Sequence, residues 1–251
     1  WMGNTRGDED GHPNEEPVHK VTFTYDFWVS PYQLTFEEYD LYCLDTGRPY
    51  PGDNGWGRDT RPVINVSWWD AIRYCNWKSE QMGFAPAYNE TSGGLLDAQG
   101  NPTTDITQVE GYRLPTEAEW EFCARGGTAD ITGGVEEHDY KYAGSNNPDE
   151  VAWYGEKWGQ QTHPVGEKQA NELGLYDMSG NIWEYCHDWF SEDWYNRGEQ
   201  TNPIGPSNGE HKSDRGGSWN SPSSHCRVVF RGHDGTNDPK NIKGFRIART
   251  N

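Results

Sequence analysis

The stretch Gly111-Tyr-Arg-Leu-Pro-Thr-Glu-Ala-Glu-Trp-Glu121 contains the clearest structural signal in the chain. Thr116 and Glu119 form the Thr-x-x-Glu pattern of a capping box, in which the two residues satisfy each other's backbone N–H groups. The pattern predicts a helix that begins after Thr116 and runs to about Arg125, with Trp120 facing inward. A pair of glycines follows directly, which is typical of a helix end.

Two similar patterns lie upstream. Thr35-x-x-Glu38 predicts a helix that runs to about Cys43. Ser67-x-x-Asp70 predicts a second one that runs to about Glu80, with apolar side chains recurring on one face. We therefore expect three helices, separated by long irregular stretches over 44–64, 84–111, 126–150 and 190–214.

Two stretches alternate between apolar and polar residues, as half-buried strands do. One runs from Val21 to Phe27, and the other from Gly244 to Ala248. Gly 30 and Pro 15 in 251 residues add many turn signals. Together these features predict an α+β fold that is rich in loops, with little regular structure.

The composition excludes several classes of protein. With 21 Lys+Arg and 40 Asp+Glu, the formal net charge is −19, which disfavours nucleic acid and anionic lipid as partners. No apolar run approaches the ~20 residues needed to span a bilayer. Aromatic residues make up 14% of the chain, whereas disordered chains are depleted in them. We expect a folded, monomeric chain that does not itself span a membrane.

The five cysteines do not form a recognisable framework. Their number is odd, and no Cys-x-x-Cys pair occurs. Cys43, Cys75 and Cys123 lie within apolar patterns and are predicted to be buried. The chain starts at Trp1 without the charged and apolar regions of a signal peptide, which suggests a mature fragment.

Four motifs in order resemble the formylglycine-generating enzymes, the sulfatase-modifying factor family. They are residues 61–71, 111–121, 174–184, and Arg215-Gly-Gly-Ser-Trp219 with Gly244-Phe-Arg-Ile247. The resemblance covers roughly residues 17–249. It implies one domain over 1–251 with a C-type-lectin-like fold, small antiparallel sheets and two to three helices. Because this fold hosts many functions, the resemblance says less about activity.

The enzymes of that family hold copper with two cysteines that follow the Arg-Gly-Gly-Ser motif. Here the two positions fall on Ser221 and Cys226. Because Cu(I) prefers soft thiolate ligands and a serine hydroxyl is hard, no copper site is expected. A copper oxidase, or a related metal-dependent oxygenase, therefore remains only as the alternative function.

The resemblance also implies a calcium site at Asp177, Gly180, Ile182 and Glu184. Residues 180, 182 and 184 alternate, so an extended backbone can direct their oxygen atoms to one side. Two carboxylates with backbone carbonyls would suit a structural Ca²⁺ ion. In the alternative interpretation, the two acidic side chains accept backbone hydrogen bonds and tie down a loop.

The segment 220–243 resembles the variable region of diversity-generating-retroelement proteins, in which randomised codons cannot encode Lys, Glu, Gln, Met or Trp. None of these five residue types occurs in 220–238. The implied function is non-catalytic ligand binding by a rigid scaffold, at a bacterial cell surface or after secretion, with an unknown protein or surface ligand. An accessory domain without a variable ligand is the third possibility.

If this interpretation is correct, the diversified residues must lie on one exposed face, because random replacement in a core destabilises too strongly. Cys226, Arg227, Arg231 and Trp219 are expected beneath them, and Phe230 is expected to be the main contact. The predicted ligand-binding residues are Asn220, Ser221, Ser223, Ser224, His225, Val229, Phe230, Gly232, His233, Asp234, Gly235, Asn237 and Asp238.

Overall fold

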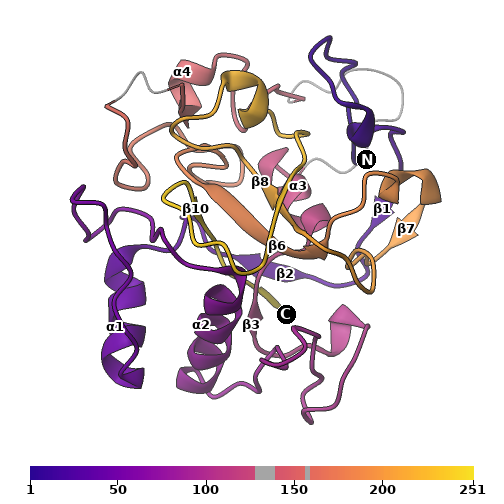
Figure 1. The fold of residues 1–251 in the computed structure, drawn as a ribbon. Helices are drawn as coiled ribbons and strands as arrows, with labels where there is room; N and C mark the ends of the chain where they lie inside the picture. Colours follow the sequence, from indigo (N-terminus) through magenta and orange to yellow (C-terminus); the bar gives the residue numbers. More distant parts are fainter. Residues whose placement is uncertain (128–138, 156–158) are drawn as a thin grey trace.

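The computed structural model describes residues 1–127, 139–155 and 159–251 (Figure 1). Helices and strands in these ranges are short, and irregular backbone joins them. The α-helices are α1 (Phe36–Thr46), α2 (Trp68–Gln81), α3 (Glu117–Ala124) and α4 (Pro148–Val151). The 3-10 turns are η1 (Pro13–Glu15), η2 (Ile106–Gln108), η3 (Trp194–Arg197) and η4 (Ser223–Cys226).

The three predicted helices α1, α2 and α3 all form, and each starts at its predicted cap. The side chains of Thr35, Ser67 and Thr116 accept a hydrogen bond from the backbone three residues later, and the acidic residue there accepts one in return. These bonds satisfy N–H groups that have no partner within the helix. Helix α1 continues past its predicted end to Gly47, whose φ of 68° terminates it.

The strands form four small sheets. The largest has the order β10-β6-β8-β9, a second has the order β2-β11-β3, and β1 pairs with β7 and β4 with β5. The strands are β1 (Val21–Thr22), β2 (Phe27–Val29), β3 (Tyr112–Arg113), β4 (Ala152–Trp153), β5 (Ser179–Gly180), β6 (Trp183–Trp189), β7 (Gln200–Thr201), β8 (Lys212–Arg215), β9 (Gly232–Asp234), β10 (Lys243–Gly244) and β11 (Ala248–Thr250).

The strand predictions need three corrections. Backbone bends divide the strand expected from Val21 to Phe27 into β1 and β2, which pair with β7 and β11. The strand expected from Gly244 to Ala248 is interrupted as well, because Arg246 turns inward to bind Glu184. The sheets are antiparallel as predicted, except for the two-residue pairs β1/β7, β4/β5 and β10/β6, which are parallel.

Aromatic residues fill much of the core. Helices α1 and α2 lie side by side (Figure 1), and Tyr39 and Tyr74 stack between them with ring centroids 5.7 Å apart. Cys43, Cys75 and Cys123 are buried, as predicted, and the other two cysteines are buried and free of disulfides as well. No helix in the described part of the chain has the length and apolar character needed to cross a membrane.

Candidate functional site

The C-terminal segment, residues 220–243, passes over the sheet that contains β6 and β8 (gold to yellow in Figure 1). It leaves β8 through a tight turn, forms η4, returns along β8 as β9 and reaches β10. Lys212 pairs with Asp234 in the register of β8 and β9. The remaining backbone of the segment is irregular, so it must be held by contacts other than sheet hydrogen bonds.

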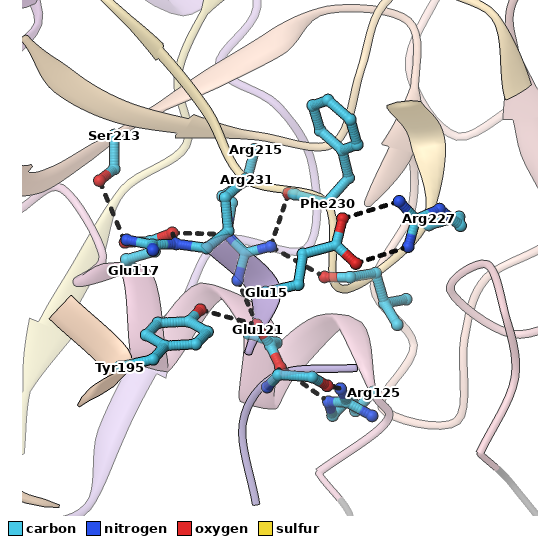
Figure 2. Close-up of polar contacts among 12 residues, drawn as sticks. Glu15, Glu117, Glu121, Arg125, Tyr195, Ser213, Arg215, Arg227, Phe230 and Arg231 are labelled. Atoms are coloured by element: carbon cyan, nitrogen blue, oxygen red, sulfur yellow. Dashed lines mark hydrogen bonds and ion pairs between the residues drawn. The ribbon is translucent and has the colours of Figure 1, made fainter. Parts of the chain in front are cut away.

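A set of buried ion pairs, which we call the arginine frame, supplies those contacts (Figure 2). Its members are Arg215, Arg227, Arg231, Glu15, Glu117 and Glu121. Nη1 of Arg215 donates to the carbonyl oxygens of Val228 and Phe230 at 3.1 and 2.6 Å. Its other nitrogens form ion pairs with Glu117 and Glu121 on α3. The planar guanidinium thus joins the segment's main chain to a helix, which a single-point cation could not do.

Arg231 completes the contact with α3. Its Nε and Nη2 bind the Glu117 carboxylate at 2.7 and 2.9 Å, and Nη1 donates to the Asn14 carbonyl at 2.9 Å. Burial raises the pKa of Glu117, but the charges of Arg231 and Arg215 outweigh it and lower the pKa to about 2. Glu117 therefore stays ionised at neutral pH, and the pair keeps its charge-assisted hydrogen bonds.

The N-terminal part of the chain belongs to the same site, which the sequence did not indicate. Arg227 binds both carboxylate oxygens of Glu15 at 2.7 and 2.9 Å and the Asp10 carbonyl at 2.9 Å. The exposed His12 packs edge-on against Phe230, with centroids 5.0 Å apart. Glu15 and Arg227 are 212 residues apart, and no local pattern marks such a distant ion pair.

The predicted ligand-binding residues differ in solvent exposure: some are exposed, some are half-buried and some are buried. Asn220, His233, Asn237 and Asp238 are exposed. The half-buried ones are Ser223, Ser224, His225, Gly232, Asp234 and Gly235. We call these ten residues the solvent layer. As predicted, Cys226, Arg227 and Arg231 lie beneath, whereas Trp219 is half-buried.

Three of the predictions were wrong, because Ser221, Val229 and Phe230 are buried. Phe230 is only 8% exposed, because its ring stacks on that of His225 and packs against that of Trp183, with ring centroids 4.3 and 5.8 Å apart. Val229 packs in the core cluster around Trp120. The Ser221 hydroxyl accepts a hydrogen bond from the backbone N–H of Ser218. These side chains support the segment and cannot be a freely variable surface.

The residues at the copper-cysteine positions offer one thiol and one hydroxyl. Cys226 is fully buried and packs against Tyr142, Val151, Ala152 and Tyr154. Burial raises the pKa of its thiol to about 12, so it is protonated at neutral pH. The serine at position 221 offers only a hydroxyl that already bonds within its own turn. This donor set lacks the pair of thiolates that Cu(I) prefers.

The four predicted calcium residues converge on the buried side chain of Gln33. The carbonyl oxygens of Asp177, Gly180 and Ile182 lie 3.1, 3.3 and 3.3 Å from Gln33 Nε2, and Glu184 Oε1 lies 3.0 Å from it. The amide group has two hydrogens for four acceptors, and Gln33 Oε1 has no partner among the described residues. The four acceptors that surround Nε2, which we call the cage, are oxygen atoms, the type of ligand that Ca²⁺ takes.

One detail of the calcium prediction was wrong. Asp177 has a φ of 55° and directs its carbonyl oxygen, not its carboxylate, toward Gln33. Its Oδ2 accepts the Gly166 N–H at 2.8 Å, so this side chain ties down a loop. The Glu184 carboxylate also binds Arg246 at 2.6 and 2.7 Å. The cage therefore contains one carboxylate, already paired with an arginine.

Comparison with known proteins agrees with this fold. The family model described as "Sulfatase-modifying factor enzyme 1-like domain" matches residues 2–251. The chain is 35% identical to "Chaperone protein LppX" of Paenibacillus barcinonensis, over 90% of this chain and 80% of that protein. It is 30% identical to the "Formylglycine-generating enzyme" of Thermomonospora curvata, over 98% of this chain and 89% of that protein. The solved structure of Treponema denticola variable protein 1 superposes with a TM-score of 0.76 at 29% identity, covering 100% of this chain and 91% of that one.

Proposed function

Because the chain belongs to the sulfatase-modifying factor enzyme 1-like domain family, whose fold hosts several functions, we propose that it is a non-catalytic ligand-binding scaffold. The binding surface is the solvent layer of the C-terminal segment. One observation carries the proposal: the arginine frame holds main-chain carbonyls of Ser224, Val228 and Phe230. Within the described residues, the side chains of Asn237 and Asp238 make no hydrogen bond, so they can change without loosening the frame.

The free-energy cost of substitutions supports this separation of the solvent layer from the arginine frame. Surface substitutions usually change stability by less than about 0.5 kcal/mol, whereas core substitutions cost about 1–5 kcal/mol. A segment tied down through its backbone can therefore tolerate many different surface side chains. The likeness to a variable protein supports the proposal, and diversification would require a template copy and a reverse transcriptase gene beside the coding sequence. We further propose a monomer that acts at a bacterial surface or after secretion, with a protein or other surface ligand.

A pair of phage-displayed libraries tests the proposal. In the first, Asn220, Ser223, Ser224, His233, Asn237 and Asp238 are randomised together; in the second, Ser221, Val229 and Phe230 are randomised. We expect most members of the first library, and few of the second, to survive protease treatment. Selection of the first library on immobilised hen lysozyme should then yield binders. Equal loss of folded members in both libraries would contradict the proposal.

An accessory function is the second candidate, favoured by the identity with a chaperone protein over most of both chains. In that case the natural surface, and not a variable one, would be required. Only the scaffold proposal expects the randomised library to yield binders to an unrelated protein such as lysozyme, so the same selection distinguishes the two functions.

Copper oxidase activity is the alternative that Ser221 disfavours. We expect no aldehyde product when the protein is incubated with Cu(I), oxygen and a cysteine-containing peptide and the peptide is analysed by mass spectrometry. The Ser221→Cys variant is the matched control, since it restores a second thiol at the family's position. Aldehyde formation by the natural chain at catalytic turnover would overturn the non-catalytic assignment.

We also propose that the cage around Gln33 binds a structural Ca²⁺ ion through Asp177, Gly180, Ile182 and Glu184. Binding to the folded state alone stabilises it by mass action, by about 2.7 kcal/mol at one hundred times the dissociation constant. We expect Ca²⁺ to raise the melting temperature. The rise should be larger for Gln33→Glu, because a second carboxylate adds negative charge that a bound cation neutralises. No shift in either protein would favour hydrogen bonding by Gln33 alone.

A further inference from the structure

The stretch from Lys20 to Ser30 leaves one of its backbone edges unpaired (Figure 1 shows β1 and β2). The carbonyls of Lys20 and Thr22 accept from the N–H groups of Gln200 in β7 and of Asn202 just after it, at 3.0 and 2.9 Å. The Asp26 carbonyl accepts from the Asn251 N–H, and the Ser30 N–H donates to the Ile247 carbonyl. These two partners lie on either side of Arg249 in β11, which pairs with Trp28. All these bonds belong to even-numbered residues.

In extended backbone, consecutive residues direct their N–H and C=O groups to opposite edges. The odd-numbered residues of β1 and β2, which are Val21, Phe27 and Val29, therefore direct these groups away from β7 and β11. Phe23 and Tyr25 lie between the two strands, where the backbone bends at Thr24 and Tyr25. The N–H and C=O groups of all five residues have no hydrogen-bond partner in the described ranges 1–127, 139–155 and 159–251. Such an open edge is a template for another strand.

A groove of about 760 Å³ lies along the same stretch, and residues 20–23 and 25–29 line it together with part of α3. Its floor is aromatic: Phe23 contacts Phe27 and Phe122, each with ring centroids 5.6 Å apart. Three lining side chains remain unusually exposed for large apolar residues, Trp1 at 38%, Trp28 at 63% and Leu173 at 48%. Apolar surface and unpaired backbone thus lie side by side.

The charges restrict what can bind there. Three charged side chains line the groove. Glu121 is buried and already paired with Arg125 and Arg215, whereas Lys20 and Asp26 are exposed. The groove interior therefore favours uncharged side chains. The chain as a whole has a net charge of −19, so residues that flank a bound segment should be basic.

We propose that this edge groove binds an extended segment of a partner protein, which adds a strand beside β1 and β2. The segment has alternating apolar residues and basic flanks. Its backbone pairs with the odd-numbered residues, and its apolar side chains lie against Phe23, Phe27 and Phe122. Backbone pairing provides affinity in such strand addition, and the side-chain pockets provide specificity. This surface is separate from the solvent layer of the C-terminal segment.

The test uses fluorescein-labelled Lys-Lys-Val-Thr-Val-Thr-Val-Lys-Lys and the full chain. We expect saturable binding by fluorescence anisotropy, and slower amide hydrogen exchange at Phe23 and Phe27 when the peptide is bound. Two control peptides keep every side chain but carry backbone N-methyl groups on alternate residues, one set on each edge. Only the peptide methylated on the pairing edge should bind at least about ten-fold more weakly, because methylation removes its donors.

Two protein variants are matched by chemistry and exposure. Leu173→Glu places a charge on the groove wall and should weaken binding about ten-fold, whereas Leu44→Glu on α1, with Leu44 71% exposed, should not. Equal binding of both methylated peptides, no effect of Leu173→Glu, or no saturable binding up to about 1 mM would overturn the proposal. A concentration-dependent dimer that Leu173→Glu abolishes would show instead that a second copy of this chain occupies the edge.

Discussion

Arg227 and Arg231 are buried in ion pairs with Glu15 and Glu117, whereas Asn237 and Asp238 in the same C-terminal segment face solvent. The first pair contacts main chain and buried carboxylates, and its removal would leave uncompensated charge. The second pair makes no side-chain hydrogen bond within the described residues. The difference shows how an irregular segment can be rigid and still variable, since one set of side chains holds the backbone and another faces outward.

The largest expected effect comes from the frame. Arg215→Met should destabilise the protein by about 3–5 kcal/mol, because Glu121 and Glu117 lose a buried partner. Urea unfolding measures the loss, and Arg48→Met provides an exposed control expected to stay within about 0.5 kcal/mol. If the two variants are equally stable, the frame does not hold the segment.

The second prediction locates the boundary between the buried side chains that support the C-terminal segment and those of the solvent layer. Phe230→Ala should cost about 3 kcal/mol, because it removes a buried ring that packs on His225 and Trp183. His233→Ala, three residues later on β9, should cost less than about 1 kcal/mol, since the imidazole is exposed. If both variants lose a comparable amount of stability, His233 belongs with the buried side chains that support the segment.

The smallest expected effect depends on pH and concerns Asp188, whose Oδ2 accepts the Glu117 N–H at 2.8 Å. Burial and the nearby Glu117 charge raise the pKa of Asp188 to about 8. Between pH 4 and 8 the folded state then binds more protons than the unfolded state at this group, so its contribution to stability falls as pH rises.

Asp188→Asn keeps the hydrogen-bond acceptor and removes the titration. Between pH 5 and pH 7, the free energy of unfolding of the variant should rise by about 1–3 kcal/mol relative to that of the wild type, as measured by urea unfolding at each pH. The exposed Asp193→Asn is the control and should follow the wild type. Parallel curves for Asp188→Asn and wild type would show that Asp188 is ionised throughout this range.

Local signals explain which parts of the structure could be predicted. The three capping boxes placed the helix starts correctly, because a capping box depends on residues only three apart. Arg227 and Arg231 were expected beneath the exposed residues, and both are buried. The partner Glu15 could not be predicted, because it lies 212 residues from Arg227. Phe230 was placed on the surface because it lies in the segment that resembles a variable region, yet the His225 ring covers it.

The site at Gln33 illustrates the same limit. Asp177, Gly180 and Ile182 form a pattern within six residues, and they do converge, as predicted. The glutamine that occupies the centre of this pattern comes from a loop 144 residues earlier. A sequence pattern shows which groups could converge, but packing of distant elements determines what stands between them.

The arginine frame also sets an order of events during synthesis from the ribosome. Glu15 and Glu117 are translated long before the arginines that neutralise them, with Arg231 following Glu117 by 114 residues. Until these arginines leave the exit tunnel, Glu15 and Glu117 lack their counter-charges, so the start of α3 must stay hydrated. The nascent chain therefore remains a partly open intermediate until a late step, and folding is completed by the segment that also carries the proposed binding surface.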